Sequence, residues 1–309
     1  MNEMMTLKSA LLDLLKELEG TNTPLIVGGG YGIYLRYLLI QEERRQTLFK
    51  ELPETRSTND LDLFIRAELL LDSAQLKPLR KAMTKLGYAV IKGAEYYQFV
   101  RPGPSGDPER GIKIDVLTGS TKPFEGTQVK FDERRVRPKP SVDLHAHPCE
   151  EAITLTEGTT TRIVRGLLRD GTPYESQVIL PHPFTFVTMK LFALRDRIND
   201  AGKDFGRHHA LDLYTVIGTL SAREWDECLR LRSQHQTDPI LIECARIVTD
   251  LFSGPDSLGT IRLRENAYFR SAFEVGEFLA ALRELFPPPN LSPTSMACLP
   301  GFWPARLHR

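Results

Sequence analysis

The chain has 309 residues, of which 41% are hydrophobic and 26% are charged, a composition typical of globular proteins. This length is more than one simple domain requires and suffices for two domains, each with its own core. Because 40 basic residues are balanced by 40 acidic ones, the composition excludes binding to nucleic acid through a global positive charge, so any such contact must come from a local patch.

The four cysteines form no C-x-x-C pair, which argues against a zinc knuckle and against a disulfide framework. Free thiols suit a reducing compartment. Acidic residues such as Asp13 and Glu17 interrupt the apolar N-terminal stretch that a signal peptide would need. No apolar run approaches the length of a membrane span. We therefore expect a cytoplasmic protein that does not enter a membrane.

The first expected elements are a helix, a short strand and a second helix. Apolar residues recur at helical spacing over 4–19, which predicts an amphipathic helix that ends near Gly20. Residues 25–27 predict a buried strand, three glycines follow at 28–30, and an apolar helix is expected over 31–40. In such a unit, backbone N–H groups at the helix start can meet a phosphate. The alternative is a tight turn in which a glycine adopts a positive φ.

Two aspartates open the next predicted strand, at 60–66. Side chains two positions apart on a strand point to the same face, so the carboxylates of Asp60 and Asp62 are expected to meet. Leu61 and Leu63 would share the other face. Two such carboxylates repel each other, and proteins usually tolerate this where a divalent cation neutralises them. The alternative is that the aspartates cap the turn before the strand.

The chain then alternates between helices and strands. A polar, charged segment at 41–57 precedes the aspartates, and a helix over roughly 68–86 follows them. Antiparallel strands are expected at 88–91 and 96–100, and a further strand at 112–117. Helices and strands that alternate in this way, with a hairpin included, predict an α/β fold with a mixed sheet.

Asp115 lies in the strand at 112–117 and is the third candidate acid. We expect it to join Asp60 and Asp62 in a carboxylate cluster that binds Mg²⁺. The alternative is a structural ion pair between Asp115 and Lys113 or Arg66.

The remaining chain changes in character at Pro183. Residues 118–182 contain several prolines and are expected to form an irregular β extension of the first domain, with short strands at 161–168 and 176–180. Helices are expected at about 184–199, 204–219, 222–234, 238–253 and 272–286. The sequence therefore predicts a mixed-sheet domain over 1–182, followed by an all-helical domain over 183–309.

These patterns resemble a known superfamily. Two glycines, a helix, Asp-x-Asp on a strand and a later Asp on another strand are similar to the pattern of the nucleotidyltransferase (polymerase-beta-like) superfamily. Within it, Arg56-x-Thr58-x-Asp60-Leu61-Asp62 resembles the R-x-[ST]-x-D-[LI]-D signature of the AbiEii/MenT-type toxins of bacterial toxin–antitoxin pairs. In contrast to the shortest members, this chain has an insertion at 41–57.

A second match lies in the helical domain. The toxins of this type carry a lysine at the start of a helix after the sheet, and later Asp-Leu-Tyr. Lys190 and Asp212-Leu213-Tyr214 correspond to these features. The resemblance covers about residues 24–65, 111–117 and 185–216.

The resemblance implies a role for each candidate residue. Asp60 and Asp62 would hold the Mg²⁺ that bridges a nucleoside triphosphate, and Asp115 would be a third ligand or the base that deprotonates the acceptor. Lys190 would contact the triphosphate or stabilise the leaving pyrophosphate, since an ammonium is a compact charge for phosphate oxygens. Asp212 would position Lys190 or orient the nucleotide.

Four further residues would bind the nucleotide. The resemblance implies that Gly29 and Gly30 allow close approach of phosphate and that Arg56 and Thr58 line the pocket. Apart from the resemblance, Lys190 on an apolar helix would be a surface residue whose ammonium reaches solvent.

The implied function is Mg²⁺-dependent transfer of a nucleotidyl group from a nucleoside triphosphate to RNA, in the first place the 3′ end of tRNA. Such an enzyme would block translation and would have a cognate antitoxin. Two alternatives stay open: a nucleotidyltransferase that modifies a small molecule or a protein, and a non-catalytic binding protein that retains the fold.

Two segments are open to two interpretations. Lys130–Lys139 contains five basic and two acidic residues and is either a surface that faces RNA or a solvated loop. The sequence His145-Ala146-His147-Pro148-Cys149 suggests zinc, but its proline and the lack of a second ligand pair favour a loop.

Overall fold

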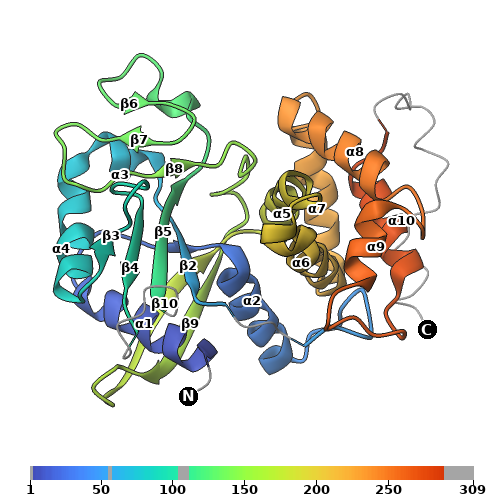
Figure 1. Cartoon of the computed structure of the whole chain (residues 1–309), viewed down its shortest axis with the longest axis horizontal. Helices are drawn as coiled ribbons and strands as arrows, with labels where there is room; N and C mark the ends of the chain where they lie inside the picture. Colours follow the sequence, from blue (N-terminus) through green and yellow to red (C-terminus); the bar gives the residue numbers. More distant parts are fainter. Residues whose placement is uncertain (1–2, 55–57, 104–110, 289–309) are drawn as a thin grey trace. The chain divides into compact units, whose positions relative to one another are not determined.

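The computed structural model describes residues 3–54, 58–103 and 111–288 (Figure 1). The chain divides into two compact units, which are described separately. The first contains 1–36 and 56–182, and the second contains 37–55 and 183–309. Residues 37–55, which the sequence analysis assigned to the first domain, thus belong with the helices of the second unit.

The first unit is built on a mixed β-sheet, which has eight strands in the described part of the chain. The strands are β1 (Ile26–Val27), β2 (Asp60–Phe64), β3 (Ala89–Val90), β4 (Gln98–Arg101), β5 (Ile112–Thr118), β8 (His147–Pro148), β9 (Thr160–Leu167) and β10 (Pro173–Leu180). Their order is β3-β4-β5-β2-β1-β10-β9, and β8 also pairs with β5. The pairs β2–β5, β1–β10 and β5–β8 are parallel and the others are antiparallel, so the prediction of a mixed sheet is confirmed.

The helices of the first unit contribute their apolar sides to one core. They are α1 (Glu3–Glu17), the first half of α2 (Gly29–Glu43), α3 (Ala67–Leu71) and α4 (Lys77–Lys85), with short 3₁₀ turns at Ser73–Leu76 and Lys122–Phe124. Leu7, Leu11 and Leu14 of α1 are buried together with Leu61 and Leu63 of β2. The core therefore lies on the leucine face of β2.

Two predictions for this unit are wrong in detail. The single helix expected over 68–86 is divided into α3, a 3₁₀ turn and α4, because Pro78 cannot donate a backbone hydrogen bond and occupies the first turn of α4. The strands β9 and β10 are not an extension of the domain. They form an antiparallel hairpin that is part of the main sheet, because Ile179 of β10 pairs with Ile26 of β1. Residues between β5 and β9 are irregular apart from β8 and a small second sheet of β6 (Lys130–Phe131) and β7 (Val136–Arg137).

The second unit is helical in its described residues. Its helices are α5 (Pro183–Arg197), α6 (Arg207–Gly218), α7 (Ala222–Gln234), α8 (Pro239–Leu251), α9 (Leu258–Arg264) and α10 (Val275–Leu285), with a 3₁₀ segment at Ala201–Gly206. The helix α9 was not expected from the sequence. At the start of α7, Ser221 and Glu224 each bond the other's backbone N–H, a capping box that fixes the helix start.

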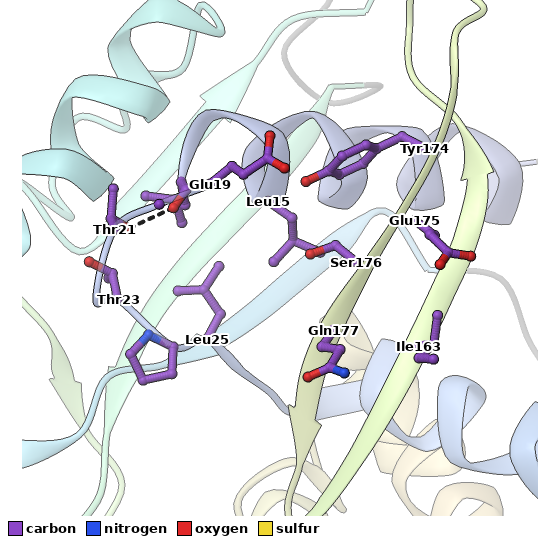
Figure 2. Close-up of a pocket in the computed structure, with 13 residues that line it drawn as sticks. Leu15, Glu19, Thr21, Thr23, Leu25, Ile163, Tyr174, Glu175, Ser176 and Gln177 are labelled. Carbon is purple, nitrogen blue, oxygen red and sulfur yellow. Dashed lines mark hydrogen bonds between the residues drawn. The ribbon is translucent and has the colours of Figure 1, made fainter.

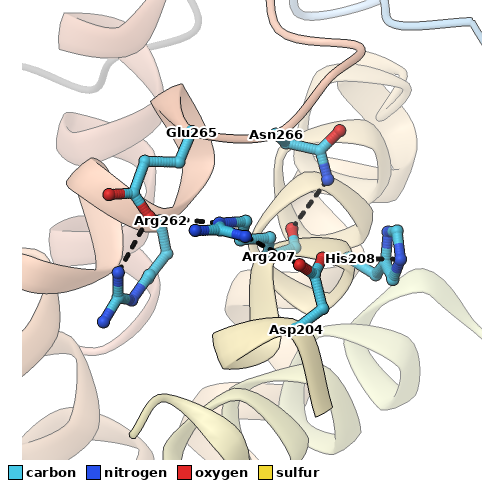
Figure 3. Close-up of polar contacts among 6 residues, drawn as sticks. All are labelled: Asp204, Arg207, His208, Arg262, Glu265 and Asn266. Atoms are coloured by element: carbon cyan, nitrogen blue, oxygen red, sulfur yellow. Dashed lines mark hydrogen bonds and ion pairs between the residues drawn. The ribbon is translucent and has the colours of Figure 1, made fainter. Parts of the chain in front are cut away.

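A strained turn joins α5 to α6. Asp204, Phe205 and Gly206 have φ values of 52°, 50° and 70°, a left-handed run that only glycine adopts without strain. Figure 3 shows Arg207 between the acids that hold this turn: its Nη1 lies 2.8 Å from Oδ1 of Asp204 and its Nε lies 3.1 Å from Oε2 of Glu265. No helix among the described residues has the length and apolar character needed to cross a membrane.

Candidate functional site

The strands β2 and β5 bring the three acids of the first unit to one face of the sheet. In the parallel pairing of these strands, Asp62 lies directly beside Asp115 and Asp60 lies beside Lys113. The three aspartates are half-buried, whereas Leu61 and Leu63 between and after them are fully buried. The predicted alternation of β2 is therefore confirmed, and Asp60 and Asp62 lie within the strand.

Asp115 occupies an environment that disfavours its charged form. Burial raises the pKa of this carboxyl, and the neighbouring carboxylates of Asp62 and Asp60 raise it further, to about 7. Gln98, its cross-strand neighbour on β4, donates a hydrogen bond of 3.1 Å from Nε2 to Oδ1. In the described part of the chain, no ion pair joins Asp115 to Lys113 or Arg66, so the structural bridge considered above is not formed.

Gly29 and Asp62 are fitted to each other. Gly29 is the first residue of α2, has a φ of 58° and is buried. A Cβ atom at this position would lie 1.5 Å from Oδ2 of Asp62, so glycine is required both by the backbone and by the carboxylate. The backbone N–H of Gly28 also donates to the carbonyl oxygen of Asp62, at 2.8 Å. The carboxylate of Asp62 thus lies at the N-terminus of α2, where the helix dipole favours negative charge.

The other residues predicted to bind the nucleotide are Gly30, Thr58 and Arg56. Gly30, in the first turn of α2, keeps part of its surface exposed. Thr58 lies two residues before Asp60, and its hydroxyl accepts a hydrogen bond of 3.3 Å from the backbone N–H of Asp60. Arg56 lies outside the residues that the structure describes.

The donor set suits a hard cation, although the side chains are not arranged as a metal cage. Asp60, Asp62 and Asp115 offer only carboxylate oxygens, the ligands that Mg²⁺ prefers. Within the described ranges, no group of three or more His, Cys, Asp or Glu side chains is placed so that it could hold a metal ion. Oδ2 of Asp62 lies against Gly29, whereas Oδ1 of Asp115 accepts a hydrogen bond from Gln98.

Two residues near the aspartates were not expected there from the sequence, where Cys149 was considered only as part of a possible zinc site. One is Gln98, whose position opposite Asp115 depends on the register of β4 and β5. The other is Cys149, a buried thiol whose backbone N–H donates to Thr118 at the end of β5. Burial raises the pKa of the Cys149 thiol well above its usual range, and the charges of Glu151, Asp62 and Asp115 act in the same direction.

In the second unit, Lys190 of α5 and Asp212 of α6 form a buried ion pair. Nζ of Lys190 lies 2.7 Å from Oδ2 of Asp212, and the two side chains are 8% and 7% exposed. The alternative in which Lys190 is a surface residue is therefore wrong. Asp60, Asp62 and Asp115 belong to the first unit, so joint action of the two groups stays a prediction.

A separate groove of about 450 Å³ lies at the end of α1, beside β9 and β10. Figure 2 shows Glu19, Tyr174 and Gln177 among the side chains that line it. The candidate residues do not line this groove, so its shape carries no information on the carboxylate site.

Comparison with known proteins identified no relative of this chain. No protein-family model matches the sequence, and no significant similarity was found to a curated protein or to a solved structure. The functional argument therefore rests on the residues of this chain.

Proposed function

We propose that the protein is a Mg²⁺-dependent nucleotidyltransferase that moves a nucleotidyl group from a nucleoside triphosphate to RNA and releases pyrophosphate. The observation that carries this proposal is the register of β2 and β5, which sets Asp62 beside Asp115 with Asp60 on the same face. Three acids held together at an internal position of a sheet repel one another and so destabilise the fold. A catalytic role for these carboxylates would explain why the chain keeps them there.

Each acid has a distinct task in this proposal. The three side chains are not placed to hold a metal ion as they stand, so Mg²⁺ binding would require them to turn toward one another. Asp60 and Asp62 would then hold the metal with Asp115 as a third ligand, and the metal would neutralise the triphosphate charge. As the alternative to ligation, Asp115 accepts the proton of the attacking hydroxyl. A carboxyl with a pKa of about 7 suits a base that works near neutral pH.

The positive groups of the site would bind the phosphates. The exposed part of Gly30 lies in the first turn of α2, where backbone N–H groups and the helix dipole favour an anion. Lys190 would stabilise the leaving pyrophosphate, and Asp212 would hold the ammonium in place through their ion pair. In the first unit, Thr58 and Arg56 would line the nucleotide pocket near Gly30.

The finer assignment rests on the motif resemblance. The signature around Asp60 and Asp62, together with Lys190 and Asp212, favours RNA as the acceptor and the 3′ end of tRNA as the modified position. On the same basis, the protein acts as a toxin that blocks translation, and a cognate antitoxin protein binds it. Its place of action is the cytoplasm.

The direct test is transfer of label from each of the four nucleoside triphosphates to total RNA or purified tRNA in the presence of Mg²⁺. Label in tRNA 3′ ends is the expected result. Replacing Asp115 by Asn should lower the rate by roughly 10²–10⁴-fold, the usual contribution of a general base. Asp62→Asn should abolish transfer, whereas Asp170→Asn, in an exposed turn of the same unit, should leave it unchanged.

Other results would redirect or reject the proposal. Label in protein or in small molecules, but not in RNA, would indicate a different acceptor. Nucleotide binding without transfer to any acceptor would indicate a binding protein. If Asp62→Asn transfers label at the wild-type rate, the assignment of the carboxylate site is wrong.

A further inference from the structure

A stacked pair of rings lies on residues next to the strands of the candidate site, since Tyr97 directly precedes Gln98 of β4 and His147 of β8 pairs with Leu117 of β5. The rings of Tyr97 and His147 have centroids 5.7 Å apart and planes inclined by 27°. Both residues are half-buried, so part of each remains accessible to solvent. A second Tyr–His contact lies nearby: the rings of Tyr96 and His145 meet edge to face, with their centroids 5.1 Å apart.

An exposed arginine holds the stacked pair in place. The side chain of Arg134 interacts with Tyr97, and its Nη2 donates to the carbonyl oxygen of Gly93 at 3.1 Å. The carbonyl oxygen of Arg134 lies 2.8 Å from Nδ1 of His147. These contacts hold the imidazole of His147 to the backbone of the segment that carries Arg134, which lowers the entropy that this ring loses on binding.

The surroundings of this pair carry positive charge. Arg134 belongs to the segment Lys130–Lys139, which has five basic and two acidic residues, and one of the acids, Asp132, is paired with Arg137 at 2.8 Å. The pKa of His145 is lowered, first by burial and then by the charges of Arg135 and Arg137. A local basic patch of this kind is what a chain with no net charge needs to attract nucleic acid.

The backbone connects this patch to Asp115. The carbonyl oxygen of Tyr97 accepts a hydrogen bond of 2.8 Å from the backbone N–H of Val116, the residue after Asp115. The next residue, Gln98, donates from its side chain to the carboxylate of Asp115. Tyr97 is thus anchored to the strand that carries the candidate base.

We propose that Tyr97, His147 and Arg134 form a stacking surface for unpaired bases at the 3′ end of the RNA acceptor. Unpaired bases stack on aromatic rings and on the planes of arginine side chains, and basic residues beside the rings hold the phosphates. The backbone bond from Val116 to Tyr97 would keep this surface attached to the strand that carries Asp115. The inference rests on the proposed function and names how its acceptor is held.

The test measures binding of a short, fluorescently labelled single-stranded RNA to the full chain, without nucleoside triphosphate and with EDTA. Tyr97→Leu removes the ring and should weaken binding by roughly 5- to 150-fold, the range found for loss of one stacked base. Tyr97→Phe keeps the ring but removes the hydroxyl, and it should bind RNA nearly as well as the wild type. Tyr174→Leu, at a half-buried tyrosine in the groove of Figure 2, is the matched control and should bind as the wild type does.

Arg134→Ala tests the contribution of charge. It should weaken binding and reduce the dependence of the binding constant on salt by about one phosphate contact. The control is Arg165→Ala, because Arg165 is also exposed and paired with Glu175 on the same sheet. It should change neither quantity. Circular dichroism and thermal unfolding show whether each variant is folded.

The outcomes separate this inference from the proposed function. RNA binding that depends on Tyr97 supports the inference even if no nucleotide is transferred, because the assay contains no nucleotide. Three results would overturn it: no RNA binding by the wild type, equal affinity of folded Tyr97→Leu and wild type, or equal affinity for duplex DNA and single-stranded RNA. Transfer to RNA that needs Asp62 but not Tyr97 would retain the proposed function and reject the stacking surface.

Discussion

The ammonium of Lys190 and the carboxylate of Asp212 lie 2.7 Å apart in the interior of the helical unit, where their side chains are 8% and 7% exposed. Taking two charges out of water carries a desolvation penalty that their mutual attraction offsets only while both partners are present. Removal of either residue would take the ion-pair partner away from a buried charge. A single substitution therefore tests stability as well as catalysis, and the two effects must be separated.

Lys190→Met should lower the free energy of unfolding by about 3–5 kcal/mol, because it leaves the Asp212 carboxylate buried without its cation. The double variant Lys190→Met/Asp212→Leu removes both charges and should recover most of this loss. Urea unfolding of the three proteins measures the difference. If Lys190 also serves the reaction, the double variant will be stable and inactive. If it is stable and active, the pair is only structural.

Gly29→Ala should destabilise the first unit and disturb Asp62. The φ of 58° alone costs a non-glycine residue roughly 1 kcal/mol, and the new methyl group would also collide with the Asp62 carboxylate. Gly20 provides the control, since its φ is 77° and a Cβ there would have no atom within 4 Å. Gly20→Ala should therefore cost only the backbone strain. Equal losses of thermal stability in the two variants would contradict the close fit of Gly29 and Asp62.

The pKa of Asp115 predicts a pH dependence of stability in protein stripped of metal with EDTA. At pH values below about 4, this carboxyl is protonated in the folded and in the unfolded chain. Between about 4 and 7, the unfolded chain loses this proton while the folded chain keeps it, so stability falls as pH rises. Asp115→Asn removes this loss. It should stabilise the metal-free protein at pH 8 by up to about 4 kcal/mol and leave it unchanged near pH 3. Thermal unfolding at both pH values measures this effect, and equal shifts at both would contradict it.

The local patterns of the sequence were sufficient to predict the alternation of β2, because Asp60 and Asp62 are separated from Leu61 and Leu63 by the two-residue period of a strand. The register that sets Gln98 opposite Asp115 and the entry of β10 beside β1 were not predictable in this way. Both depend on pairing between segments that are distant in sequence, which leaves no local pattern. The burial of Lys190 is a third case. The resemblance implied that Asp212 positions Lys190, but only the packing of α5 against α6 buries the pair.

The last prediction concerns the strained turn before α6, where Phe205 has a φ of 50° and its ring lies under the guanidinium groups of Arg207 and Arg262, at 5.2 and 4.5 Å from the ring centroid. Phe205→Gly and Phe205→Ala both remove the ring, but only glycine relieves the left-handed backbone. We therefore expect the Gly variant to be more stable than the Ala variant by about 1 kcal/mol.

The control is the pair of variants Asp226→Gly and Asp226→Ala, at an exposed residue in the middle of α7. There the difference in stability between glycine and alanine should have the opposite sign. In a helix interior, glycine is less stable than alanine by roughly 1 kcal/mol. Urea unfolding of the four variants compares the two sites. If alanine is the more stable residue at position 205 as well, the turn stores no strain, and the ion pairs of Arg207 in Figure 3 stabilise an ordinary loop.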